Sequence, residues 1–203
     1  MIALVALIVR GGVPWLAAAA TVIATSSVTR DWRMPIPLNE VGATSAVAII
    51  QGLLAALLTL PVLAREQPLL ETLRNARARA VRAGLLATTT ITLAIATLVG
   101  VQTGGGVHSV RTALSSLVGI GLGALSLRTS GIPSWLAPIA LVCFMLVFGV
   151  DRDDDAARPW AWLLAEQPAI STPQLLAYLT IGIAGVLAFT LLSPRTDRDE
   201  DAG

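Results

Sequence analysis

The feature that most constrains this chain is a series of six apolar blocks separated by short polar segments. We place the blocks at about 13–28, 42–63, 83–101, 112–127, 134–150 and 173–192. A helix needs about 20 apolar residues to cross a hydrocarbon core of roughly 30 Å. Because a backbone in lipid must satisfy its own hydrogen bonds, such blocks form helices there. The pattern therefore predicts an all-α, polytopic membrane protein with six transmembrane helices.

The composition supports this class. Hydrophobic residues make up 55% of the chain and charged residues only 13%, whereas charged residues are about a quarter of a typical soluble domain. We therefore expect one transmembrane domain over residues 1–192, located in a plasma or inner membrane. The charge-rich remainder, residues 193–203, is predicted to be a disordered tail.

The orientation in the membrane is predicted from the arginines alone, because the chain contains no lysine. Arginine concentrates in short cytoplasmic loops of membrane proteins. With a cytoplasmic N-terminus, nine arginines fall in the inner segments and five in the outer segments. The cluster between Arg65 and Arg82 decides the balance. The prediction is that both termini are cytoplasmic.

The segment between the second and third blocks, residues 64–82, predicts a short amphipathic helix on the cytoplasmic surface. Pro68 suits a first helical turn, and Glu71 lies near the positive end of that helix. Leu69, Leu70 and Leu73 form an apolar edge. Two interpretations stay open: the arginines set topology and contact anionic headgroups, or the helix docks a cytoplasmic partner.

The layout resembles the permease subunit of ABC-2-type exporters. The features that carry the resemblance are six spans with both ends inside, the amphipathic helix after span two, the segment Arg10–Trp15, which reads Arg-Gly-Gly-x-Pro-Trp, and the outer loop Asp151–Thr172. Small actinobacterial members are similar in the Arg10–Trp15 lead-in and in the arginine-rich loop. The long N-terminal interface helix of that family has no equivalent here beyond Met1–Val9.

The resemblance implies that a separate ABC ATPase drives the chain and that the permease works as a homodimer or as a heterodimer with a related permease. The cytoplasmic loop would dock the ATPase, with Arg65, Glu66, Leu70, Glu71 and Arg74 as the docking residues. ATP and magnesium would then bind to the ATPase, so no cofactor is expected in this chain. The alternative is a non-catalytic structural or accessory membrane protein of another complex.

The sequence gives little support for a catalytic site. Gly104–Gly106 lacks the Lys-Ser/Thr that completes a phosphate loop. The acidic run from Asp151 to Asp155 departs from the aspartate motif of CDP-alcohol phosphotransferases and is interpreted as a solvated loop, with no metal site. His108, the one histidine, has no neighbouring nucleophile or carboxylate in sequence and is interpreted as an interfacial residue. We expect neither enzymatic activity nor nucleic-acid binding.

Small residues at four-residue spacing predict close helix packing, because helices in lipid associate through small side chains. The fourth block carries Ser115, Gly119 and Gly123 on one face, and the sixth carries Thr180, Ala184 and Ala188. The contact can lie within one chain or across a dimer. The lipid bilayer surrounds these helices in either case.

Overall fold

The computed structural model describes residues 12–29, 45–64, 75–129, 133–148 and 172–191. These residues form six α-helices and contain no β-strand, so the all-α prediction is confirmed for this part of the chain. The helices are α2 (Gly12–Ala24), α3 (Ser45–Ala64), α5 (Asn75–Gly100), α6 (Gly106–Thr129), α7 (Leu136–Phe148) and α8 (Thr172–Leu191). Each lies in one predicted apolar block or extends from it.

Two helices begin earlier than predicted. Helix α5 starts at Asn75 rather than near residue 83, and α6 starts at Gly106 rather than near residue 112. Alanine and arginine are good helix formers, and nothing between Asn75 and Ala83 breaks a helix. Hydropathy shows where the apolar residues end, but helix propensity determines where the helix itself ends. The second half of the predicted surface helix, from Asn75, is therefore continuous with α5.

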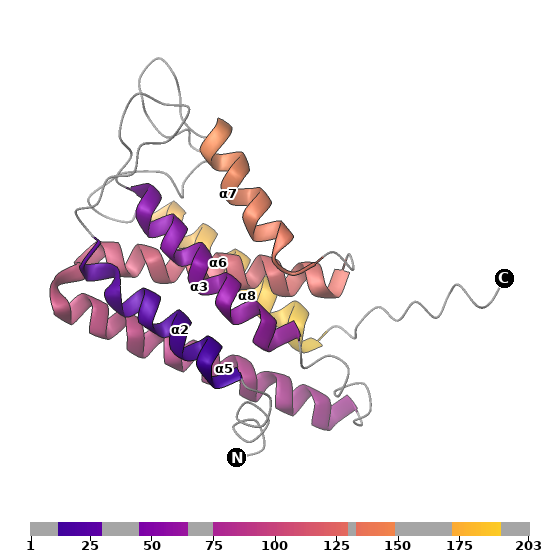
Figure 1. Ribbon diagram of the computed structural model, residues 1–203. Helices are drawn as coiled ribbons and strands as arrows, with labels where there is room; N and C mark the ends of the chain where they lie inside the picture. The colour runs from indigo at the N-terminus through magenta and orange to yellow at the C-terminus, as the bar shows by residue number, and fades with distance from the viewer. Residues whose placement is uncertain (1–11, 30–44, 65–74, 130–132, 149–171, 192–203) are drawn as a thin grey trace.

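A tight reversal joins α5 to α6. One turn of π-helix, Val101–Gly105, follows α5, and Gly104 and Gly106 both take positive φ, at 99° and 49°. Glycine adopts this conformation without steric cost. The chain turns back there, so α5 and α6 form an antiparallel pair (Figure 1).

Helix α6 lies at the centre of the bundle, with α3 on one side and α8 on the other (Figure 1). Contacts in register show that all three run in the same direction. Along α3 and α6, Gly52 meets Ser115, Ala56 meets Gly119, and Leu60 meets Gly123. Along α8 and α6, Gly182 meets Leu117 and Gly185 meets Gly121.

The other three helices run the opposite way. Leu16 of α2 packs with Val62 of α3 and Leu85 of α5, while Ile23 packs with Ala55 and Ala96. Thus α2 is parallel to α5 and antiparallel to α3. In α7, Pro138 lies opposite Gly119, and the preceding Ser134 lies opposite Gly123. Successive helices therefore alternate in direction through the described chain.

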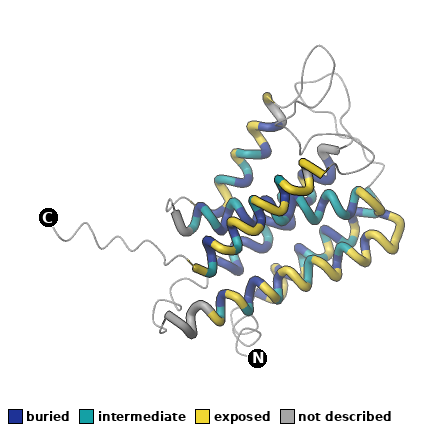
Figure 2. The backbone as a smooth tube through the Cα atoms, turned by 180° about the vertical axis from the view of Figure 1, so that it is seen from behind, coloured by how far each residue is buried: buried dark blue, intermediate teal, exposed yellow. Residues whose placement is uncertain are grey.

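Among the described residues, the continuous helical stretch Ala80–Leu127 is long and apolar enough to cross a membrane, and it includes the reversal at Gly104. Four shorter apolar helical stretches accompany it: Gly12–Ser27, Val47–Leu63, Leu136–Met145 and Leu175–Leu191. Exposed positions recur along α5 and α8 (Figure 2), and many of them are large apolar residues.

Candidate functional site

Hydrogen-bonding side chains gather at the end of the bundle where α5 turns into α6. Three links cross between elements: Ser26 with Ser109 at 2.7 Å, Gln51 Nε2 to Thr29 Oγ1 at 2.7 Å, and Thr103 Oγ1 to Ser27 Oγ at 3.0 Å. His108 Nε2 lies 3.3 Å from Gln51 Oε1. We call this set the polar cluster: Ser26, Ser27, Thr29, Gln51, Thr103, His108 and Ser109.

Local sequence explains why these side chains meet. After α2, a short 3-10 turn, Thr25–Ser27, presents its serines toward the α5–α6 reversal. A Cβ on either Gly100 or Gly105 would collide with the Ser109 side chain. The two glycines therefore leave the space in which Ser109 reaches Ser26. Both serines are fully buried, so the bond between their hydroxyls satisfies groups that have no access to solvent.

Polar groups continue from the cluster along α6. Thr112 Oγ1 donates to the His108 carbonyl at 3.0 Å, and Ser116 Oγ donates to the Thr112 carbonyl at 2.9 Å. Ser115, on the same helix, is 6% exposed, and its side chain is within hydrogen-bonding reach of Tyr178. The Tyr178 hydroxyl of α8 lies beside it, in the field of Arg111.

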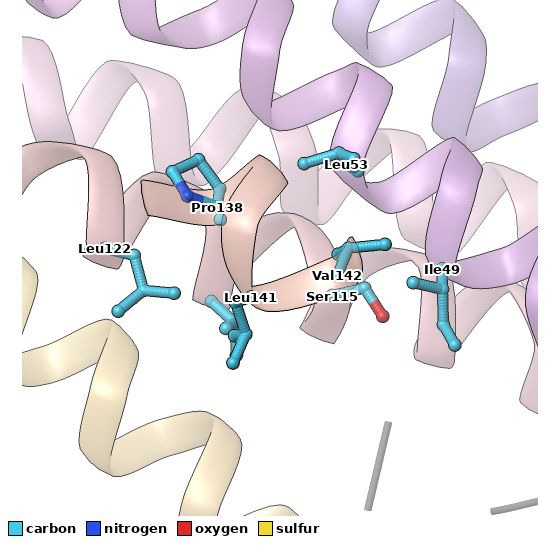
Figure 3. A pocket seen from close by; sticks show the side chains of 9 residues that line it. Ile49, Leu53, Ser115, Leu122, Pro138, Leu141 and Val142 are labelled. Carbon is cyan, nitrogen blue, oxygen red and sulfur yellow. The ribbon is translucent and has the colours of Figure 1, made fainter. Parts of the chain in front are cut away.

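Ser115 also lines a crevice between α3, α6 and α7 (Figure 3). The crevice is narrow, with a cavity volume of about 10 Å³, and is partly open to the outside. Its walls are apolar apart from the Ser115 hydroxyl. The lining residues are Ile49, Leu53, Ser115, Val118, Gly119, Leu122, Pro138, Leu141 and Val142.

The predicted packing face of α6 lies against α3. An added Cβ at Gly119 would come within 2.6 Å of the Ala56 Cβ, and one at Gly123 would strike the Leu60 side chain and come within 2.7 Å of the Ser134 carbonyl oxygen. Ser115 meets Gly52 in the same row, at 2.5 Å from the position of an added Cβ. The structure thus places all three residues, Ser115, Gly119 and Gly123, in a close contact within one chain.

The predicted face of α8 is placed differently. Ala188 is buried, but Thr180 and Ala184 are exposed. The contact with α6 is made instead by Gly182 and Gly185, which lie one or two positions further along the helix. Small residues on α8 form more than one row along the helix, so spacing alone does not identify the row that faces α6.

The predicted docking residues Arg65, Glu66, Leu70, Glu71 and Arg74 lie outside the described residues, as does the acidic run Asp151–Asp155. Within the described ranges, no group of three or more histidine, cysteine, aspartate or glutamate side chains is arranged to hold a metal ion. His108 lies within the polar cluster, half-buried and next to the Gln51 amide.

Sequence reasoning missed Gln51 and Tyr178. Gln51 is the one amide inside the second apolar block, and a polar side chain at such a position needs a partner from another helix. That signal was present in the sequence. Tyr178 gave no signal, because a tyrosine in an apolar helix also suits the membrane interface.

Comparisons of the chain with protein-family models, with curated proteins and with solved structures gave no match. Neutral donors and acceptors line one end of the bundle, a half-buried arginine lies one turn further along α6, and an apolar crevice follows.

Proposed function

We propose that the chain is an integral protein of the cell membrane that crosses the bilayer six times. The observation that carries this proposal is the inverted distribution of side chains. Ile91, Ile95 and Leu98 on α5 are each more than half exposed, and so are Leu176 and Ile183 on α8. Contact between so continuous an apolar surface and water is unfavourable, whereas contact with lipid is not.

The interior supports the same conclusion. Many of its buried polar groups are hydroxyls, and the closest helix contacts involve glycine, alanine and serine. Helices in lipid gain little from burying leucine, and they associate through small residues and interhelical hydrogen bonds. The threonines of α5 follow the pattern of membrane helices: Thr88, Thr92 and Thr97 each donate to the carbonyl four residues earlier.

Helix direction and length fit six crossings with both termini on the cytoplasmic side. Six helices that alternate in direction suit six successive passages. Helices α3, α5, α6 and α8 have 20 to 26 residues, which gives each about 30 Å or more at 1.5 Å per residue. Helices α2 and α7, with 13 residues each, are the shortest and would need local thinning of the bilayer or further apolar residues to cross.

The function that suits this architecture best is that of a permease subunit in an ATP-driven ABC-type exporter. In this proposal a separate ATPase binds the cytoplasmic loop through Arg65, Glu66, Leu70, Glu71 and Arg74. ATP and magnesium belong to that partner, and this chain carries no catalytic step. The exposed small residues Thr180 and Ala184 of α8 provide a surface on which a second permease, identical or related, packs.

The geometry of α5 supports mechanical coupling. The helix begins at Asn75, directly after the proposed docking residues, and continues without interruption to Gly100. Over 26 residues it extends about 39 Å. Its far end enters the reversal that carries Thr103 and leads into His108. A displacement of the docking segment would therefore be transmitted along a stiff helix to the polar cluster at the opposite end.

Co-purification tests the proposal. The tagged chain is expressed with an ABC ATPase encoded beside it, extracted in mild detergent and assayed for the bound ATPase. We expect Leu70→Asp to abolish the complex, because it places a charge on the apolar edge of the docking helix. Thr72→Asp adds the same charge outside that edge and serves as the matched control.

Two outcomes would contradict the exporter proposal. One is retention of the ATPase by Leu70→Asp at the level of the unchanged chain. The other is loss of the ATPase with both variants alike, because the charge and not the apolar edge would then matter. A chain that enters the membrane but never retains an ATPase favours the alternative, a structural or accessory protein of another complex.

A further inference from the structure

We propose that the polar cluster is a latch that fastens the end of α2 to α3 and to the α5–α6 reversal, and that its release admits water to a buried row of hydroxyls on α6. This inference goes beyond the exporter proposal, because it depends neither on the ATPase nor on which side of the membrane this end of the bundle faces. The observation that carries it is a chain of hydrogen bonds that can run in one direction only.

The chain of hydrogen bonds begins just after α2. Thr29 Oγ1 donates its single hydrogen to the Ser26 carbonyl oxygen at 3.1 Å, so toward Gln51 it can only accept. The group that approaches it at 2.7 Å is therefore the amide NH2 of Gln51, which turns the Gln51 carbonyl oxygen toward His108. A carbonyl oxygen only accepts, so Nε2 of His108 carries a hydrogen and donates it across the 3.3 Å between the two atoms.

The side chains of this chain of bonds come from different elements. Thr29 follows the 3-10 turn at the end of α2, Gln51 lies on α3 and His108 lies on α6, so Gln51 joins two other elements at once. The bond between Ser26 and Ser109 is a further link from the end of α2 to α6. Hydrogen bonds between membrane helices each contribute modestly. The set therefore holds this end of the bundle together, and rotation of the Gln51 side chain alone releases two of its bonds.

The α5–α6 reversal makes few other buried contacts among the described residues. Residues 101–104, 106 and 107 are all exposed, and Gly105 is the buried residue between them. A segment with few buried contacts opens at a lower free energy than the helices around it. Turns of π-helix such as this one are rare and occur frequently at functional sites. The latch thus secures the part of the bundle that opens most easily.

Directly behind the latch, α6 carries a row of buried hydroxyls. Ser109, Thr112 and Ser116 are spaced by three and four residues, so they share one face of the helix. All three are fully buried, and the two deeper hydroxyls donate to carbonyls of their own helix. Each of these oxygens can also accept a hydrogen bond, so water that passes Ser109 finds successive acceptors along α6. The latch therefore controls whether this row is dry or hydrated.

The test is thiol accessibility in the full chain, purified in detergent, with Cys143→Ser as the background. Ser116→Cys places one thiol at the inner end of the buried row, and a charged, water-soluble methanethiosulfonate measures how often water reaches it. We expect Gln51→Leu to raise the labelling rate about fivefold or more, because it removes both bonds of the Gln51 amide and increases the open population. Gln102→Leu removes an amide at an exposed position of the reversal and, as the matched control, should leave the rate unchanged.

A second thiol separates opening of the latch from general loosening of the bundle. Ser126→Cys lies buried near the opposite end of α6 and should label at the same slow rate with and without Gln51→Leu. Equal acceleration of both thiols would overturn the proposal. An unchanged rate at Ser116→Cys in the presence of Gln51→Leu would overturn it as well.

His108 tests the direction of the hydrogen bonds and covers the case in which Gln51→Leu does not fold. His108→Gln keeps a donor that can reach the Gln51 carbonyl oxygen and should keep Ser116→Cys as slow as in the background chain. His108→Leu removes the donor and should raise the rate about two- to threefold. Equal rates for the two variants would contradict donation by His108 and with it the latch. The exporter proposal is scored by retention of the ATPase alone, so either proposal can fail without the other.

Discussion

Helix α6 meets α8 and α7 in two different ways, and the comparison explains the shape of the bundle. Against α8, Gly121 faces Gly185, and the two backbones approach so closely that an added Cβ would strike the main chain. Against α7, Pro138 lies opposite Gly119 and Ser134 opposite Gly123, and further along the helix Val142 and Met145 pack with Val118 through larger side chains. In Figure 1 α7 leans outward from the other helices. Small residues therefore decide which helices form a rigid block and which leave a crevice.

The largest expected effect is at the α6–α8 contact. Gly185→Leu introduces a side chain where the Gly121 backbone lies, and the backbone cannot move aside cheaply. We expect a loss of about 3 kcal/mol or more in the free energy of unfolding. Thermal unfolding in detergent with a size-exclusion check measures it.

Ala184→Leu, at the adjacent exposed position of α8, is the control and should unfold near the temperature of the unchanged chain. If the two variants lose the same stability, the contact between Gly121 and Gly185 is not what holds α8 to α6.

A moderate effect is expected at the α3–α6 contact, where the neighbour is a side chain. An alanine at position 119 would place its Cβ 2.6 Å from that of Ala56. We expect Gly119→Ala to cost about 1–2 kcal/mol. The double variant with Ala56→Gly removes the facing methyl group and should recover most of that loss in the same unfolding assay. Absence of any recovery would show that the two helices do not meet at these residues.

The smallest effect is expected in the polar cluster. Ser26→Ala leaves the buried Ser109 hydroxyl without its partner at 2.7 Å. The expected cost is about 0.6–1 kcal/mol, since hydrogen bonds between membrane helices contribute modestly. Ser26→Ala with Ser109→Ala should cost no more than the single change, because no orphaned hydroxyl remains. A strictly additive double-mutant cycle would contradict the bond.

Much of the fold followed from the chain's hydropathy, because each of the predicted blocks contains one helix. The helix ends could not be predicted from hydropathy, because Arg82, His108 and Arg111 are polar yet lie within α5 and α6. Spacing of small residues placed Ser115, Gly119 and Gly123 on one face of α6, where they contact α3. On α8 the contact with α6 is made by Gly182 and Gly185, and packing of Thr180, Ala184 and Ala188 across a dimer stays a prediction.

The candidate site was less accessible to sequence reasoning. Gln51 and His108 are 57 positions apart, and Ser26 and Ser109 are 83 apart. No local pattern links residues so distant in sequence. Their meeting depends on the direction of α3 relative to α6 and on the reversal at Gly104, both of which are tertiary features.

The central claim is that the two ends of α5 face opposite sides of a membrane, and cysteine labelling tests it most directly. With the native Cys143 replaced by serine, Ala80→Cys and Val107→Cys place single thiols at exposed positions near opposite ends of α5. In intact cells a membrane-impermeant maleimide should label Val107→Cys at once and Ala80→Cys only after permeabilisation. Equal labelling of both positions from the same side would contradict the account.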